Sequence, residues 1–363
     1  MRSNTLSVQP AVTSGRSNYL TILEDAWQAH LAPRAADAPT VISTFAGAGG
    51  SSLGYSMAGY RELLAVEWDD NAVETFRLNF PDVPVYHGDI AKLSVEQVLD
   101  MTGLQPGQLD VFDGSPPCQG FSTAGKRVMD DPRNGLFREY VRLLRGLQPK
   151  VFVMENVSGM VKGKMKLIFA EILRELKASG YKVSARLMNA MYFNVPQSRE
   201  RMIFIGVRND LEIEPSHPRA EAQPVTVREA WEDIDNQTFG PEVKGQTLDR
   251  LQKCKPGQDF ADIIGVRSNF SFKRTDFDRP CWSVPKSGSL AGYCYLFHPT
   301  EHRGLTLEEL KRVSSYPDGM HFTDFQNGMN RIGNSVPPLF MRAIALHIRR
   351  HILDNLQGDI NCA

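Results

Sequence analysis

The sequence predicts an α/β protein with a doubly wound, mostly parallel sheet and a second, smaller and irregular domain. Three observations support this fold class. Short runs rich in Val, Ile, Leu and Phe alternate with helical patterns from residue 40 to residue 207. A glycine-rich turn follows the first of these runs, as in sheets joined by crossover helices. After Val207 the alternation stops, and Pro, Gly and turn residues become frequent.

Each predicted strand is a short apolar run, and each predicted helix repeats its apolar residues at helical spacing. The strands expected are 41–45, 63–66, 85–87, 109–112, 151–154, 183–188 and 202–207, and the helices expected between them are 51–58, 71–79, 95–101, 136–147 and 165–179. Helical patterns return at 306–314 and 338–356, and 19–31 is amphipathic. We therefore expect an N-terminal extension of unknown role (1–39), a first domain (40–207), an irregular domain (208–302) and a C-terminal segment that returns to the first domain (303–363).

Composition narrows the class of protein. The 363 residues carry a net charge of −1 and include no apolar run of bilayer length, and residues 1–17 are polar. We expect an intracellular, cytoplasmic protein without a membrane span. The cysteines, at 118, 254, 281, 294 and 362, contain no C-x-x-C pair, which argues against a disulfide framework and a redox motif. Cys281, Cys294, His298 and His302 lack the close cysteine pair of a zinc finger, so no metal site is predicted.

Cys118 follows the rigid Pro116-Pro117 pair at the end of a predicted strand. Two prolines remove two backbone donors and prevent a helix, so the chain leaves the sheet as an extended turn. The polar neighbours Gln119 and Ser122 favour a thiol that faces a cleft, which is the setting of a nucleophile. The alternative is a buried cysteine that packs as a small apolar side chain.

The glycine-rich turn at 45–54 predicts a cofactor site. Gly47, Gly49 and Gly50 allow the backbone to approach a ligand closely. Glu67 ends the second predicted strand 20 residues after Gly47, where a carboxylate accepts hydrogen bonds from ribose hydroxyls. Asp89 follows the third strand and either accepts from an adenine amino group or caps a helix. The spacing is not G-x-G-x-x-G and no Walker lysine is present, so an adenosine with an amino-acid tail fits better than a dinucleotide.

A carboxyl and two guanidiniums are expected near the thiol. Glu155 follows the strand 151–154 at the sheet edge where such folds bind ligands. Gln197, Arg199 and Arg201 alternate before the strand 202–207 and so point one way, although an arginine here can instead pair with Glu200 at the surface. These groups suit thiolate attack on C6 of a pyrimidine, with Glu155 as proton donor and Arg199 as hydrogen-bond donor to the ring. Carbon 5 then becomes nucleophilic enough to accept a methyl group from a sulfonium.

Taken together, these residues resemble the cytosine-C5 DNA methyltransferase family of bacterial and phage type, from about residue 41 to residue 356. The motifs that carry the resemblance are Phe45-Ala-Gly-Ala-Gly-Gly, Glu67-Trp68, Gly88-Asp89-Ile90, Pro116-Pro117-Cys118-Gln119-Gly120-Phe121-Ser122, Glu155-Asn156-Val157, Gln197-x-Arg199-x-Arg201, Arg303-x-Leu305-Thr306 with Glu309, Arg312 and Tyr316-Pro317, and Gly333-Asn334-Ser335-Val336-Pro337-Pro338.

The resemblance implies a Rossmann-like catalytic and cofactor-binding domain at 40–207 and a target recognition domain at 208–302. It implies S-adenosylmethionine as methyl donor, Cys118 as nucleophile, Glu155 as the group that protonates N3, and Arg199 as a contact of the flipped base, with Arg201 beside it. The cofactor pocket would be lined by Phe45, Gly47, Gly49, Gly50, Glu67, Trp68, Asp89, Ile90, Pro116, Leu136, Asn334, Ser335 and Val336.

The implied macromolecular partner is double-stranded DNA. Between residues 244 and 286 there are nine Lys or Arg against five Asp, a local surplus of four positive charges that suits phosphate contact. The expected DNA contacts are Gln119, Ser122, Lys126, Arg127, Arg133, Gln197, Lys273, Arg274 and Lys286. A monomer is a further expectation from the family, with a role either in restriction-modification beside a cognate restriction endonuclease or as an orphan epigenetic methylase.

Two rival functions differ in substrate or activity. A side branch of the family acts on transfer RNA, and its members follow Pro-Pro-Cys-Gln with Pro-Phe and carry a Cys-Phe-Thr signature; here Gly120-Phe121 follows, and Cys-Phe-Thr is absent. A catalytically silent DNA-binding member would lack the cysteine, the glutamate or an arginine, all of which are present.

Overall fold

The computed structural model describes residues 18–117, 135–161, 165–220, 223–234, 240–265, 271–286 and 295–358. Its main feature is a seven-stranded sheet of order β3-β2-β1-β4-β5-β8-β6. The strands are β1 (Thr40–Thr44), β2 (Arg61–Glu67), β3 (Val85–His87), β4 (Val111–Gly114), β5 (Val151–Val157), β6 (Tyr181–Asn189) and β8 (Glu200–Arg208). The first five pair in parallel, and β8 runs antiparallel to both β5 and β6. This confirms the predicted mostly parallel α/β fold.

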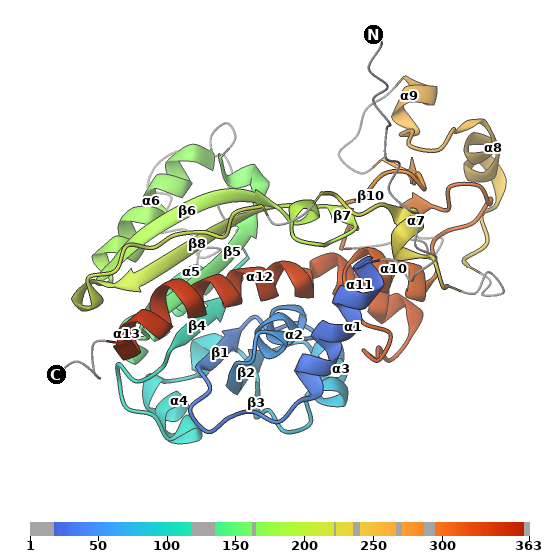
Figure 1. The fold of residues 1–363 in the computed structure, drawn as a ribbon. Helices are drawn as coiled ribbons and strands as arrows, with labels where there is room; N and C mark the ends of the chain where they lie inside the picture. Colours follow the sequence, from blue (N-terminus) through green and yellow to red (C-terminus); the bar gives the residue numbers. More distant parts are fainter. Residues whose placement is uncertain are drawn as a thin grey trace, which may run out of the picture.

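Helices cover both faces of the sheet. Successive residues of each central strand point to opposite sides, and because both sets are apolar, both faces must be buried. One face, with Val41, Val111 and Val153, packs with α1 (Asn18–Leu31), α2 (Gly50–Met57) and α12 (Pro338–Ile348). The other, with Ile42, Phe112 and Phe152, packs with α4 (Val95–Thr102), α5 (Gly135–Leu147) and α6 (Met165–Ala178). Figure 1 shows α12 lying along the sheet. The remaining first-domain elements are α3 (Asp70–Asn79), η1 (Ile90–Lys92), η4 (Ser158–Val161), η5 (Ala190–Tyr192) and η6 (Asn209–Leu211).

The described residues between 240 and 297 build a small region with its own core of Val243, Leu251, Cys254, Phe260 and Phe297. Its elements are short: α8 (Gly245–Lys253), α9 (Ala261–Ile264), β9 (Lys273–Arg274), β10 (Cys281–Trp282) and β11 (Leu296–Phe297). β10 pairs in parallel with β7 (Gln197–Ser198), which ties the region to the chain just before β8. By contrast, α7 (Val227–Ala230) packs into the large core. The boundary predicted at residue 208 therefore precedes residues that join the first core, and the domain division stays a prediction.

The C-terminal segment contains one helix that the sequence pattern did not predict. α10 (Leu307–Val313) begins at Thr306 with a capping box to Glu309, and α11 (Phe325–Asn334) follows it. α11 contains Gly328 and Gly333, which weaken a helical pattern; its start is fixed by Asp324, whose side chain accepts from the Asn327 N–H. α12 then continues as a π-turn, η7 (Arg349–Leu353), and α13 (Asp354–Gly358). None of the described helices is long and apolar enough to cross a membrane.

Candidate active site

The turn from β1 to α2 has an unusual backbone that places amides at the carboxyl edge of the sheet. Phe45 has φ of +56°, a left-handed conformation that is uncommon for a side chain of this size. Gly47 and Gly49 also have positive φ, of 56° and 90°. A Cβ built on Gly47 meets nothing within 4 Å, so open space adjoins the turn at that point. Strained backbone of this kind concentrates at ligand sites.

Glu67, at the end of β2, faces this turn. Its Oε2 accepts from the Gly47 N–H at 2.7 Å, and its Oε1 accepts from the Trp68 and Asp69 N–H groups at 2.8 and 2.9 Å. The Glu67 side chain is buried, whereas Trp68 beside it is 76% exposed. An anchored carboxylate next to an open aromatic face suits a ribose and a base.

Other predicted cofactor residues gather around the same edge. Phe45, Ile90 and Leu136 belong to one apolar cluster, with Phe45 and Leu136 only partly buried. Gly50 lies against the end of α11, because a Cβ on Gly50 would come 2.7 Å from the Val336 carbonyl oxygen and 2.8 Å from Ser335 Cβ. Asn334 itself is exposed.

Asp89 caps the short helix η1. Its Oδ1 accepts from the Ala91 N–H at 3.0 Å, which is the capping alternative considered for this residue. The side chain is exposed, so its second oxygen can face a ligand as well.

The thiol side of the site is only partly within the described chain. Cys118, Gln119, Ser122, Lys126, Arg127 and Arg133 lie outside the described residues. The turn that leads to the thiol is described: Pro116 is buried, and its carbonyl oxygen accepts from Asn156 Nδ2 at 3.1 Å. Asn156 follows Glu155 directly on β5, so this bond fixes the Pro116-Pro117 turn beside the strand that carries Glu155. Asn156 is a functional residue that the sequence did not single out, although it is part of the Glu155-Asn156-Val157 motif.

Glu155 and Arg201 form a nearly buried ion pair, with Arg201 Nε 2.6 Å from Glu155 Oε1 and side-chain exposures of 15% for Arg201 and 11% for Glu155. They are brought together by the pairing of β5 with the antiparallel β8, in which Val157 lies opposite Arg201 and Glu155 opposite Ile203. A guanidinium beside a carboxylate at a sheet edge can orient it toward a substrate and neutralise charge that builds on a ring.

Arg199 has a different environment from the one predicted. It is 2% exposed, its Nη1 donates to the Val284 carbonyl at 2.9 Å and to Ser283 Oγ at 3.2 Å, and its Nη2 donates to the Gly333 carbonyl at 2.7 Å. Burial, and next the charge of Arg201, lowers the pKa of this guanidinium below its usual range. Arg199 therefore joins three segments of the chain, and its expected contact with a base is not supported, because its Nη groups are bound internally.

Two predicted DNA contacts are also internal. Gln197 is 1% exposed and bonds Ser314 Oγ at 2.8 Å while accepting from the Val284 N–H. Arg274 is 5% exposed and donates to the carbonyl oxygens of Cys254, Leu251 and His298 at 2.9, 3.1 and 3.2 Å. Gln197 links β7 to the C-terminal segment, and Arg274 links segments of the small region. Because both side chains are buried, neither reaches the surface where DNA would lie.

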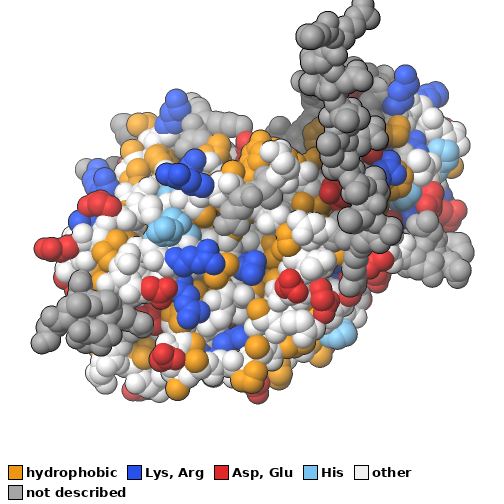
Figure 2. All heavy atoms as spheres, viewed as in Figure 1, with side chains coloured by type: hydrophobic (Ala, Val, Ile, Leu, Met, Phe, Trp, Pro, Cys, Tyr) orange, Lys and Arg blue, Asp and Glu red, His pale blue; other side chains and the backbone are white. Residues whose placement is uncertain are grey.

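The other two predicted contacts of the small region do reach the surface. Lys286 is exposed. Lys273 is partly exposed, and its Nζ lies 5.2 Å from the centre of the Trp282 ring. On the face shown in Figure 2, described basic and acidic side chains are interspersed, in keeping with the small net charge.

Asp113, on β4, is a buried acid that the sequence did not single out. It lies five residues before the thiol and accepts from Tyr55 Oη at 3.3 Å. Burial, and next the negative charges of Glu62 and Glu155, raises its pKa to about 8. Burial also raises the pKa of Glu62 to about 7. The neutral forms of these acids are therefore favoured inside the sheet, where no described arginine or lysine bonds Asp113.

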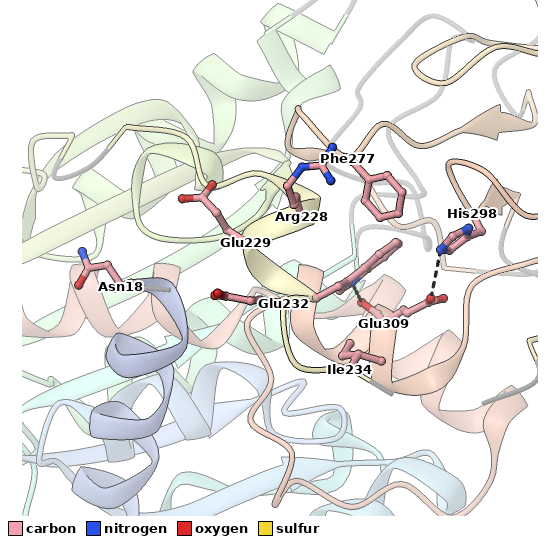
Figure 3. A pocket seen from close by; sticks show the side chains of 9 residues that line it. Asn18, Arg228, Glu229, Glu232, Ile234, Phe277, His298 and Glu309 are labelled. Carbon is pink, nitrogen blue, oxygen red and sulfur yellow. Dashed lines mark hydrogen bonds and ion pairs between the residues drawn. The ribbon is translucent and has the colours of Figure 1, made fainter. Parts of the chain in front are cut away.

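A cavity of about 560 Å³ lies apart from these residues, where α7 and α10 meet the start of α1 (Figure 3). Trp231 stacks on His298 with ring centres 5.7 Å apart, and Trp231 Nε1 donates to the Glu309 carbonyl at 3.1 Å. None of the residues that line it belongs to the predicted cofactor or base site, and Arg228 and Glu309 are paired with Asp278 and Arg303. This cavity belongs to the join between the small region and the large core.

The chain matches the C-5 cytosine-specific DNA methylase family over residues 39–350 and belongs to that family. It is a DNA cytosine methyltransferase. It is 37% identical over 331 residues to the Type II methyltransferase M1.HphI of Haemophilus parahaemolyticus, which covers 84% of this chain and 85% of the relative. It is 31% identical over 361 residues to M.XorII of Xanthomonas oryzae pv. oryzae, with 86% of this chain and 85% of the relative covered. A solved E. coli structure, described as a DNA modification methyltransferase encoded within a prophage, is similar with a TM-score of 0.71 at 25% identity, covering 87% of this chain and 100% of that one.

Proposed function

We propose that this enzyme methylates C5 of a flipped cytosine within a short specific sequence of double-stranded DNA, through a covalent bond between Cys118 and C6. The observation that carries this proposal is the hydrogen bond from Asn156 to the Pro116 carbonyl, because it holds the turn that precedes the thiol beside Glu155 and its partner Arg201.

The residues at the β1–α2 turn fit S-adenosylmethionine. Glu67 would accept from the ribose hydroxyls, and exposed Trp68 would stack on the adenine. Turn amides other than those of Ala46, Gly47 and Gly49, which bond within the protein, would hold the carboxylate of the amino-acid tail. When bound, this cofactor supplies an electrophilic methyl group on a sulfonium. Two features of the chain shape the site that would hold the cofactor. Glu67 is anchored by the Gly47 N–H, and Gly50 leaves room for Ser335 and the Val336 carbonyl oxygen.

At the base, Cys118 as a thiolate adds to C6, and the ring takes up negative charge. Glu155 exchanges a proton with N3 so that this charge is neutralised. We assign to Arg201 the hydrogen bond to the ring oxygen that the sequence gave to Arg199, because Arg201 lies beside Glu155 while Arg199 is bound to Ser283, Val284 and Gly333. After C5 accepts the methyl group, water takes the C5 proton, and the electron pair of that C–H bond re-forms the C5–C6 double bond as the C6–S bond breaks and the thiolate leaves. Glu155 then takes back the proton from N3.

The DNA would lie against the open side of this edge and the small region. Lys273, Lys286, Lys126, Arg127 and Arg133 are proposed phosphate contacts, and Gln119 and Ser122 contacts near the flipped base. We further propose that the enzyme works as a cytoplasmic monomer in a restriction-modification pair, in line with the relatives named Type II methyltransferases.

The substrate can be tested directly. The purified protein and S-adenosylmethionine are incubated with unmethylated genomic DNA and, separately, with total transfer RNA, and both are read by bisulfite sequencing. Protected cytosines in one short recurring DNA motif are the expected result. Protection only in the RNA would move the enzyme to the transfer-RNA branch, and protection in neither would make it a silent DNA-binding member.

A further inference from the structure

The N-terminal helix α1 lies outside the part of the chain that matches the family, which begins at residue 39. It is nevertheless part of the large core: Tyr19, Leu20, Leu23 and Ala26 are buried in one cluster with residues of α2, α7 and α12. Figure 1 shows α1 extending from near α2 and α3 toward α7 and α10. A helix placed there can restrict the motion of the cofactor turn, of the small region, or of both.

One end of α1 is fixed to the C-terminal segment. Tyr19 Oη donates to the Arg312 carbonyl, and Arg312 in turn pairs with Asp233 at 2.9 Å and Asp318 at 2.6 Å. Further along, Trp27 lies against Gly319, where a Cβ would come 2.5 Å from Trp27 Cζ2. These contacts leave the orientation of α1 little freedom, because they fix it at two points about two turns apart.

The other end of α1 contacts the helix that follows the glycine-rich turn. Ser56 Oγ, on α2, lies 2.7 Å from His30 Nδ1 and accepts from Arg34 Nη2 at 2.6 Å. The arginine can only donate, so the Ser56 hydroxyl keeps its own proton for Nδ1 when the ring proton is on Nε2. Burial, and next the charge of Arg34, lowers the pKa of His30 to about 4, so the ring is neutral at physiological pH.

The His30 ring also supports the floor of the turn. It stacks on Trp27 with centres 4.8 Å apart and meets the edge of Phe80 at 5.6 Å. Phe80 lies directly beneath Gly49: a Cβ on Gly49 would come 2.3 Å from Phe80 Cε2. Trp27, His30 and Phe80 thus form a continuous row of rings from α1 to the residue of the turn with φ of +90°.

We propose that α1 braces the cofactor turn and that His30 is a positioning residue, which acts through Phe80 on Gly49 and so sets the affinity for S-adenosylmethionine. This inference rests on the proposed function of the turn. A backbone held in left-handed conformations needs its surroundings to keep it there. Without the row of rings the turn relaxes between conformations, and binding must pay the entropy of ordering it again.

The test measures binding of S-adenosylhomocysteine to the full-length protein by isothermal titration calorimetry, together with the melting temperature. His30→Ala removes the ring, and His30→Phe keeps a ring without the acceptor. Gln28→Ala is the matched control, since Gln28 lies exposed on the same helix and, among the described residues, its side chain bonds only that of Glu24. Phe80→Leu shrinks the floor beneath Gly49, and the double variant His30→Ala/Phe80→Leu closes a mutant cycle.

We expect His30→Ala and Phe80→Leu each to weaken binding about tenfold, the double variant to lose no more than about tenfold, and His30→Phe and Gln28→Ala to stay within about twofold of the parent. A His30→Ala protein that binds with the parent's affinity, or additive losses in the double variant, would overturn the proposal even if the melting temperature falls. Should His30→Ala not fold, normal affinity in Phe80→Leu would overturn it in the same way. Failure of the parent itself to bind would instead overturn the proposed function.

Discussion

The carboxyl edge of the large sheet and the small region at 240–297 use buried arginine in opposite ways. At the sheet edge, Arg201 faces the carboxylate of Glu155, a group that can exchange a proton with a substrate. In the small region, Arg274 donates to the backbone carbonyls of Cys254, Leu251 and His298. Backbone carbonyls do not exchange protons at these pH values, so these bonds hold the fold and take no part in proton transfer.

In this chain, the partner of a buried guanidinium therefore distinguishes an arginine that takes part in the chemistry from one that supports the fold. A guanidinium whose donors end on backbone carbonyls fixes segments to one another, as Arg274 does and as Arg199 does between Ser283-Val284 and Gly333. A guanidinium paired with a side-chain carboxylate at the ligand edge is available to chemistry. The following variants test this division, beginning with the largest expected effect.

Glu155→Gln keeps the shape of the side chain and removes its acid-base function. We expect kcat to fall about 10³-fold, which is within the range of general acid catalysis, while DNA affinity stays within about threefold. Single-turnover methylation and a filter-binding titration measure the two quantities. Glu200→Gln, an exposed position next along the chain from Arg199, is the control. An unchanged rate in Glu155→Gln would remove this residue from the chemistry.

Arg199→Met and Arg201→Met should separate stability from rate. Loss of Arg199 leaves two buried carbonyls without their donors and should lower the free energy of unfolding by about 3 kcal/mol. Arg201→Met should instead lower kcat about 100-fold with a smaller change in stability, because it removes charge compensation at the base. Denaturant titration and steady-state kinetics report these effects. The reverse pattern would restore the base contact to Arg199.

The adjacent residues Lys273 and Arg274 offer the same comparison within the small region. Arg274→Met should destabilise the protein by about 2 kcal/mol, since four carbonyl acceptors lose this donor. Lys273→Met should lower the free energy of unfolding by less than about 1 kcal/mol, since only partly exposed contacts with Trp282 and Asp259 are lost. It should weaken DNA binding by less than about tenfold and reduce the salt dependence of binding by about one ion. Equal stability losses in the two variants would contradict this division of roles.

A pH dependence of the free energy of unfolding is expected from Asp113. Its folded pKa of about 8 exceeds the value of about 3.9 in an unfolded chain. Between those limits the folded state binds more protons, so the free energy of unfolding falls as pH rises, by at most about 1.4 kcal/mol per pH unit. Asp113→Asn should flatten this slope, with a smaller slope remaining from Glu62. Urea denaturation at pH 5 through 9 measures it, and parallel curves for the two proteins would refute the assignment.

Much of the first domain could be predicted from sequence because its strands are buried on both faces and read as apolar runs. β3 was predicted with its observed bounds, and the other sheet strands were found with ends shifted by a few residues, since polar ends such as Glu62 and Glu155 extend them. α11 was missed because its glycines and asparagines conceal the helical period.

At the site, the sequence placed Glu67 and the glycine-rich turn together, and the structure shows the bond between Glu67 and Gly47. It could not assign the arginines. Period-two alternation put Gln197, Arg199 and Arg201 on one face, but β7 ends at Ser198 and β8 begins at Glu200, so Arg199 lies at a break between strands. Its partners, Ser283, Val284 and Gly333, are distant in sequence, and local spacing carries no information about them.

Covalent capture of the enzyme on DNA that contains 5-fluorocytosine tests directly whether Cys118 bonds to C6 of the cytosine. Fluorine replaces the C5 proton whose loss releases the cysteine, so a methylated adduct cannot break down. With S-adenosylmethionine present, we expect a complex that survives denaturing electrophoresis, joined at Cys118 by peptide mass spectrometry and absent from Cys118→Ala. A Cys118→Ala protein that still methylates cytosine, or an adduct at another residue, would contradict the account.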